Sequence, residues 1–127
     1  MRIDKDLVAA SATPLVLGIL ADGESYGYAI LKRVNELSEG HLEWTDGMLY
    51  PLLHRLERQG HVEAHWRLAD NGRRRKHYEI TTDGRAALAE RRRQWEVVAA
   101  ALDQLRAEGA KLGDSMGTAM WPQGAGA

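Results

Sequence analysis

The 127-residue sequence predicts a mainly α-helical domain with a two-stranded β hairpin, followed by one long helix. Three segments in the first half place apolar side chains three and four residues apart, the spacing of helices that bury one face. A segment of alternating apolar and charged residues then leads to Asn71-Gly72, a dipeptide typical of tight hairpin turns. Beyond residue 82 apolar side chains recur every seven residues, which indicates a helix that packs against another helix.

The first three segments predict helices over residues 4–20, over residues 26–37 and between Thr45 and Gly60. Pro14 lies inside the first segment, where it either begins a shorter helix or kinks a longer one. Thr45 is a favourable N-cap and Gly60 a favourable stop for the third helix. Four leucines are expected to form the buried side of that helix: Leu49, Leu52, Leu53 and Leu56.

The hairpin is expected to consist of strands over residues 62–68 and 77–81 with a turn between them. Tyr78 alternates with charged neighbours along the second strand, so we expect its side chain in the core rather than at the surface.

The hairpin also carries a concentration of positive charge. Five basic residues and one acid lie between Arg67 and Lys76, although the whole chain has a formal net charge of −1. A cluster of this kind is a local anion-binding surface. Taken alone, the same run would also fit a solvated charged loop.

The final helix is expected over residues 82–108. A hairpin domain of this size cannot bury a long apolar stripe, so the stripe needs a partner, and a second copy of the chain is the economical one. The residues expected in this homodimer interface are Leu88, Trp95, Val98, Leu102 and Leu105. Residues 109–127 are rich in Gly and Ala and predict a disordered tail.

Composition excludes several classes of function. The chain has no cysteine, which rules out disulfides, zinc–thiolate sites and cysteine nucleophiles. The five histidines form no metal-binding motif, and no glycine-rich phosphate loop or catalytic triad has a local signature. We therefore expect no enzyme, no catalytic residues, no metal and no cofactor. The sequence also lacks a membrane segment and a signal peptide, so we expect a cytoplasmic protein.

The order of three helices, a hairpin and a long helix is that of a winged helix-turn-helix domain, here expected over residues 4–81. In that arrangement the third helix enters the major groove of double-stranded DNA. The hairpin, or wing, follows the backbone or the adjacent minor groove. The basic run on the hairpin agrees with DNA as the partner.

Three stretches resemble the PadR family of bacterial transcription regulators. They are Tyr-Gly-Tyr-Ala-Ile at residues 26–30, the stretch from Gly47 to Gly60, and the stretch from Gly72 to Thr81. The final helix resembles the single C-terminal dimerisation helix of the smaller PadR subfamily. The resemblance covers about residues 5–106, and the tail lies outside it.

The resemblance implies a homodimer that represses transcription from a palindromic operator. It places DNA contacts at Tyr26, Tyr28, Thr45, Met48, Tyr50, Arg55, Arg73, Arg74, Arg75 and Lys76. Met48 departs from the family pattern, which often has Ser or Thr there, and a thioether cannot donate a hydrogen bond. Two of these residues have alternative roles, since Tyr50 could pack against the wing and Arg55 could pair with Glu57 or Glu43.

Trp95 matches the position of a tryptophan that lines a dimer pore in some relatives, where flat aromatic compounds stack. The resemblance therefore raises a small aromatic effector as a further partner, with Trp95 as its contact. An ordinary tryptophan packed in a dimer core is the alternative. Two other functions remain open: a winged-helix module for protein–protein interaction, and a metal or small-molecule sensor without strong DNA specificity.

Overall fold

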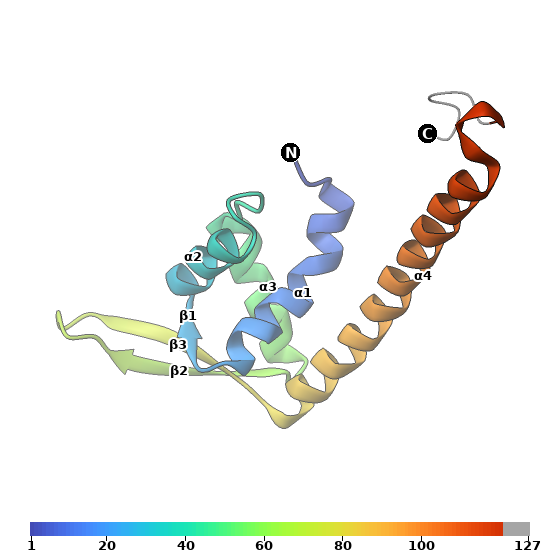
Figure 1. Ribbon diagram of the computed structural model, residues 1–127. Helices are drawn as coiled ribbons and strands as arrows, with labels where there is room; N and C mark the ends of the chain where they lie inside the picture. The colour runs from blue at the N-terminus through green and yellow to red at the C-terminus, as the bar shows by residue number, and fades with distance from the viewer. Residues whose placement is uncertain (121–127) are drawn as a thin grey trace. The chain divides into compact units, whose positions relative to one another are not determined.

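The computed structural model describes the backbone of residues 1–120 and the side chains of residues 1–111. Along the chain lie α1 (Lys5–Ala21), β1 (Ser25–Tyr26), α2 (Gly27–Leu37), α3 (Asp46–Arg58), β2 (Val62–Leu68), β3 (Arg74–Ile80) and α4 (Thr82–Met120) (Figure 1). Contacts between residues within the chain divide it into two units. The first unit ends at Arg91, and the second begins at Arg92. The predicted class, mainly helical with a β wing and a long C-terminal helix, is confirmed.

α1 continues through Pro14 as one helix, so this proline does not begin a shorter one. Since proline has no N–H, the carbonyl of Ala10 loses its helical hydrogen bond. The helix is held by the apolar residues that follow Pro14, because Val16 and Leu17 are fully buried and Leu20 is 1% exposed.

The core of the first unit lies where α1, α2 and α3 meet one end of the sheet. The four leucines of α3 are between 0% and 5% exposed, which confirms the buried face predicted for this helix. Tyr78 is 1% exposed, as predicted for the second strand. The remaining members of the core include Ile30 and Val34 of α2, Val62 of β2 and Ile80 of β3.

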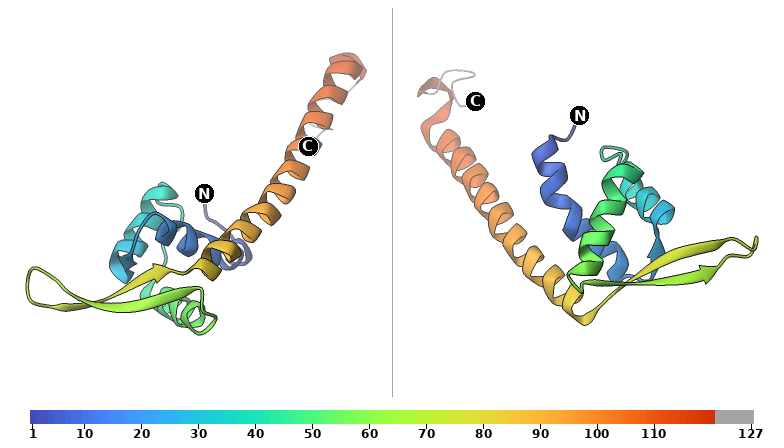
Figure 2. Two further views of the ribbon diagram at one scale, coloured as in Figure 1. Left: turned by 90° about the horizontal axis from the view of Figure 1, so that it is seen from below. Right: turned by 180° about the vertical axis from the view of Figure 1, so that it is seen from behind.

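The sheet has three antiparallel strands in the order β1-β3-β2, one more than the sequence predicted. β1 has two residues, too few to show an alternating pattern, and it pairs Ser25 with Tyr78. β2 and β3 form the wing, in which Val62 pairs with Ile80 near the helices and Leu68 with Arg74 near the tip. Two further views show the wing extending beyond the helices that cover its base (Figure 2).

The wing turn is tight. Ala69 and Gly72 donate backbone hydrogen bonds of 2.8 and 2.9 Å to the carbonyls of Arg73 and Ala69. Gly72 has φ 82°, a left-handed conformation that glycine adopts without a steric cost. The Asn-Gly dipeptide therefore places the arginines that follow it at the tip of the wing.

α4 begins at a specific hydrogen-bonded junction. The hydroxyl of Thr81 donates to the Gly60 carbonyl at 2.6 Å and accepts from the Gly84 N–H at 3.0 Å. Leu88 is 5% exposed and packs into the core of its own chain. The sequence placed Leu88 in the homodimer stripe, but in the structure the exposed stripe begins only at Trp95.

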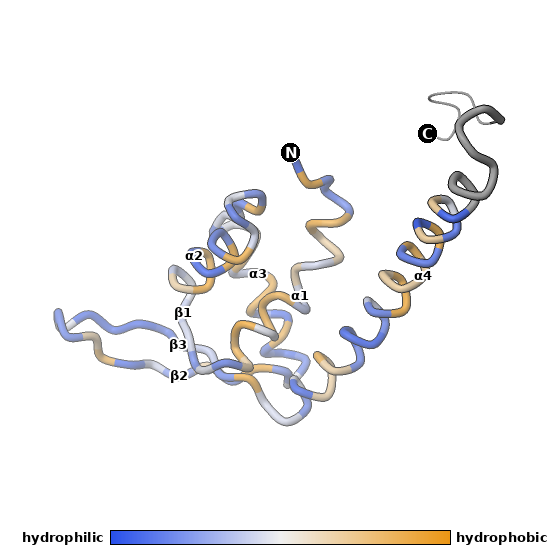
Figure 3. Tube along the Cα trace, viewed as in Figure 1, coloured by the Kyte–Doolittle hydropathy of each residue, from blue (hydrophilic) through white to orange (hydrophobic). Residues whose placement is uncertain are grey.

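The second unit consists of α4 from Arg92 onward. Apolar and polar residues alternate along this part of the helix (Figure 3). α4 continues to Met120, twelve residues beyond the predicted end at Glu108, because isolated glycines weaken a helix without ending it. The predicted disordered tail therefore coincides with helix up to Met120, and its remainder, residues 121–127, lies outside the described residues. Within the part that is described, no helix has the length and apolar content needed to cross a membrane.

Candidate nucleic-acid interface

A groove of about 510 Å³ separates the wing from the first turn of α2 and the middle of α3. Aromatic and cationic side chains line it together. The lining residues are Tyr26, Gly27, Tyr28, Tyr50, His54, Trp66, Arg73, Arg74, Arg75, Lys76 and Tyr78. Seven of the ten predicted DNA contacts are thus brought to one surface; the other three are Thr45, Met48 and Arg55.

Aromatic rings hold two of the wing arginines. The guanidinium of Arg74 lies 5.0 Å from the centre of the Trp66 ring, and that of Arg75 lies 4.7 Å from the centre of the Tyr26 ring. Stacking of this kind orients the guanidinium but leaves its N–H groups free to donate. Among the described residues, neither arginine forms an ion pair with a carboxylate, and the same holds for Arg73.

The other two cations of the basic run pair within the chain. Lys76 Nζ lies 3.7 Å from Glu57 Oε1. Arg67 donates two hydrogen bonds to Glu24, from Nε to Oε1 at 2.7 Å and from Nη2 to Oε2 at 2.9 Å. The hydrogen bond from Arg67 lowers the pKa of the Glu24 carboxyl, and the same contact raises the pKa of Arg67. The run of five basic residues therefore contains three cations that remain available to a ligand.

α3 presents Tyr50 and His54 to the groove, four residues apart on one face of the helix. The Tyr50 hydroxyl contacts Gly27, where a Cβ atom would displace it, so this glycine lets the first turn of α2 approach the second turn of α3 closely. Tyr50 therefore packs against α2 and also lines the groove. The residue is 39% exposed. His54 was not among the residues predicted from the sequence, although its spacing of four residues from Tyr50 is a signal that could have identified it.

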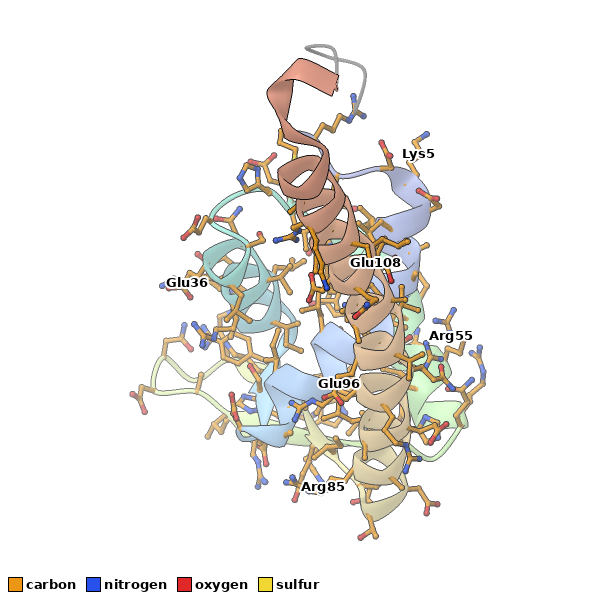
Figure 4. All side chains as sticks on the ribbon, turned by 45° about the vertical axis from the view of Figure 1, so that its right-hand side comes forward. Lys5, Glu36, Arg55, Arg85, Glu96 and Glu108 are labelled. Atoms are coloured by element: carbon orange, nitrogen blue, oxygen red, sulfur yellow. The ribbon has the colours of Figure 1, made fainter. Side chains whose placement is uncertain are left out.

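Two of the three predicted contacts outside the groove lie elsewhere on α3, and the third directly precedes this helix. Thr45 is the exposed N-cap residue, and its side chain forms no capping hydrogen bond. Arg55 is exposed and projects from α3 (Figure 4), about 140° around the helix from Tyr50. Met48 is half-buried against the core and lines a different pocket, so its side chain does not join the groove.

The N-terminus of α2 opens onto the same groove. Its N-cap residue, Tyr26, provides no side-chain hydrogen bond to the first turn, whose N–H groups therefore lack that partner. Tyr28 in this turn is 70% exposed. A helix N-terminus with free N–H groups favours an anion, as do the neighbouring arginines.

Tyr78 forms part of the groove wall from β3. Its hydroxyl is buried and contacts no hydrogen-bond partner in the part of the chain that the structure describes. Burial raises the pKa of Tyr78, and the nearby Glu57 and Tyr50 raise it further, so the phenol stays neutral.

The described residues contain no cluster of three or more His, Cys, Asp and Glu for a metal ion. The groove is therefore a cationic and aromatic surface suited to a polyanion.

Comparisons with known proteins agree with this arrangement. The profile of the PadR-like transcriptional regulator family matches residues 16–90, which include every residue that lines the groove. The transcriptional regulator Rv3488 of Mycobacterium tuberculosis is 42% identical over 84 residues, which cover 66% of this chain and 75% of that protein.

Solved structures are similar over most of the chain. A PadR-like transcriptional regulator from Bacillus cereus has a TM-score of 0.70 and 26% identity, and the match covers 80% of this chain and 96% of that one. A PadR family regulator from Eggerthella lenta has a TM-score of 0.66 and 32% identity, with 79% and 85% covered.

The Glu24–Arg67 pair generates a prediction about acid stability. Because the folded-state pKa of Glu24 is lowered, its carboxylate stabilises the fold above the ordinary carboxyl pKa, and this contribution is lost as pH falls through the folded pKa. Glu24→Gln should therefore lower the thermal unfolding midpoint at about pH 5, and the difference from wild type should shrink towards about pH 2.

Glu36→Gln is the matched control, since Glu36 is an exposed residue of α2 outside the pair. That variant should follow the wild-type midpoint over the whole range. A Glu24→Gln deficit that stays constant with pH would contradict the assignment of this carboxylate.

Proposed function

Because this chain belongs to the PadR-like family of transcriptional regulators, we propose that it is a homodimeric repressor of a palindromic operator in double-stranded DNA. Membership of the family makes it a transcriptional regulator rather than an enzyme. The observation that carries the proposal is the group of Arg73, Arg74 and Arg75 at the groove, with no carboxylate partner among the described side chains. A protein with this function acts at the nucleoid, in the cytoplasm.

The proposed docking follows from the exposed surfaces. α3 enters the major groove with Tyr50 and His54 on the side that faces the wing. The wing arginines then reach the sugar–phosphate backbone or the adjacent minor groove. Tyr28 and the N-terminus of α2 lie beside a phosphate, and Thr45 and Arg55 reach the duplex from the other exposed side of α3.

The homodimer is supported by the second unit. Trp95, Val98, Leu102 and Leu105 are between 47% and 64% exposed, although they repeat at the spacing of a helix–helix contact. Their exposure to water is unfavourable, and a second copy of α4 buries them. Two-fold symmetry then presents two copies of α3 to half-sites about 34–36 Å apart, which requires a palindromic operator.

We further propose that a small flat hydrophobic compound acts as an effector at the dimer interface. Trp95 is 47% exposed, so a symmetric pair of these indoles offers two faces between which a planar compound can stack. Occupancy would change how the two α4 helices cross and hence the spacing of the two α3 helices, which relieves repression.

Replacing the three wing arginines should weaken DNA binding in a salt-dependent way. The combined variant Arg73→Gln, Arg74→Gln and Arg75→Gln should bind all sequences less tightly at low salt. The slope of log affinity against log salt should flatten by about 3, since each lost phosphate contact contributes roughly 0.9. Electrophoretic mobility shifts across a salt series provide the measurement.

The control variant combines Lys32→Gln and Arg33→Gln, which removes positive charge from α2 at residues that line a different surface pocket. It should keep most of the wild-type slope. Equal slopes for wild type and the triple variant would contradict contact between the wing arginines and DNA, and would favour a protein-interaction module.

Placing a charge in the exposed stripe should dissociate the dimer. Leu102→Glu puts two carboxylates against apolar surface at the two-fold axis, where they cannot be paired. Sedimentation velocity should show a monomer at concentrations where wild type is dimeric. Gln104→Glu adds the same charge on the opposite side of the helix and should remain dimeric; a dimeric Leu102→Glu variant would place the interface elsewhere.

Acridine, a flat aromatic compound that is mostly uncharged at neutral pH, is the probe for this effector site. Saturable quenching of tryptophan fluorescence is expected in wild type and is lost in Trp95→Ala. Trp66→Ala is the control, because Trp66 is also exposed but lies on the wing. If Trp95→Ala binds the probe with unchanged affinity, Trp95 is not part of the effector site.

A further inference from the structure

The wing carries two exposed apolar residues on β2, Trp66 and Leu68, which are 58% and 74% exposed. Hydropathy colouring shows an apolar stretch close to the hydrophilic tip of the wing (Figure 3). A single exposed leucine is common on protein surfaces and has no functional meaning by itself. The position and the surroundings of Leu68 distinguish it from such a residue.

Leu68 lies on the side of the wing that faces the groove. Side chains two residues apart on a strand share a face, so Leu68 points to the same side as Trp66, which lines the groove. Its cross-strand partner is Arg74, which also lines the groove. Cross-strand partners lie on one face of a sheet. Leu68 therefore continues the proposed DNA surface towards the tip of the wing.

The side chain of Arg74 does not cover Leu68. Although the two residues are paired, the Arg74 guanidinium lies 5.0 Å from the centre of the Trp66 ring. The arginine thus stacks on the tryptophan, and Leu68 remains the most exposed large apolar side chain of β2 and β3. A partner that buried it would remove unfavourable contact with water.

The hydrogen-bonded turn holds Leu68 in place. Leu68 is the last residue of β2, and the N–H of the next residue, Ala69, binds the Arg73 carbonyl at 2.8 Å. The Arg73 N–H in turn binds Asn71 Oδ1 at 3.0 Å. A side chain on a backbone that is already ordered loses less entropy when it is buried in a complex.

The charges around Leu68 define the chemistry of its partner. Three arginines of the wing, Arg73, Arg74 and Arg75, have no carboxylate partner among the described side chains, and they outnumber Asp70, the acid of the turn. An apolar side chain among cations matches an apolar surface that lies between anions. In duplex DNA the stacked bases lie between two phosphate backbones. The minor groove, about 6 Å wide, admits a side chain.

We propose that Leu68 is a wedge that inserts from the minor groove between two base pairs beside each half-site and kinks the duplex. Minor-groove proteins use leucine in this way, and the resulting bend lets the DNA contact more of the protein surface. Here the bend brings further phosphates to the wing arginines, which offsets the cost of unstacking the bases. The inference rests on the proposed function, because it requires the wing to lie on DNA.

The wedge also predicts a sequence preference that needs no hydrogen bond to a base. Pyrimidine–purine steps such as TA and CA unstack readily, whereas A-tracts are stiff and have a narrow minor groove that attracts arginine. The wing arginines alone therefore favour an A-tract, and Leu68 favours a TA or CA step. A step of this deformable kind is expected in the operator where the tip of the wing lies.

Two fluorophores on one duplex test binding and insertion separately. The probe is an alternating TA duplex in which 2-aminopurine replaces several adenines and one end carries fluorescein. Fluorescein anisotropy measures binding of the full-length protein in low salt, and 2-aminopurine emission rises when its base is unstacked. Wild type should raise both signals to saturation. Leu68→Ala should still raise the anisotropy, because the arginines remain, but should lose the rise in 2-aminopurine emission.

Two further variants are the controls. Leu37→Ala removes the same side chain from a 50% exposed leucine at the end of α2, outside the wing, and should act as wild type does. Leu68→Met restores a long apolar side chain and should recover the emission rise. In competition with an unlabelled A-tract duplex, Leu68→Ala should shift its preference towards the A-tract relative to wild type.

The two signals distinguish failure of the wedge from failure of the proposed function. Saturated anisotropy without an emission rise in wild type would overturn the wedge and leave DNA binding intact. An emission rise that persists in Leu68→Ala, or one that Leu68→Met does not recover, would overturn it as well. No change in anisotropy even in low salt would contradict the proposed function, and the wedge with it.

Discussion

Burial of one end of β3 determines where the wing arginines lie. Tyr78 and Ile80 are 1% and 7% exposed and pair with β2, and Tyr78 also pairs with β1, which fixes this strand against the three helices. At the other end of the same strand Arg74 and Arg75 are exposed and are held by Trp66 and Tyr26. Because a paired β-strand is extended, fixing the base of β3 in the core also fixes the direction in which the tip of the wing extends. The groove between wing and α3 follows from that single constraint.

The electrostatics of the chain are local rather than global. The net charge of the chain is −1, but its cations differ in their pairing. Glu24 and Glu57 neutralise Arg67 and Lys76. The three arginines between these paired cations keep their charge for a ligand. Because interactions between exposed charges are screened within about 10 Å, the acids elsewhere on the chain do not cancel this patch.

Local patterns predicted most of the fold, and the basic run indicated where on the hairpin an anion would bind. The α3 leucines, Tyr78 and the wing turn followed from periodicity and turn chemistry, which depend on neighbours along the chain. The two-residue β1, the contact of Tyr50 with Gly27, and the burial of Leu88 and Met48 depend on tertiary packing, which a single sequence does not display. The spacing of His54 from Tyr50 places both on one helix face, but only the fold shows that this face lines the groove.

In the proposed complex, paired copies of α3 and of the wing bind a two-fold symmetric site in duplex DNA. Selection of fragments bound by the purified full-length protein from genomic DNA, followed by hydroxyl-radical footprinting, tests it most directly. We expect one enriched inverted repeat with two protected stretches about one helical turn apart. No enrichment even in low salt, or a single asymmetric footprint, would contradict it.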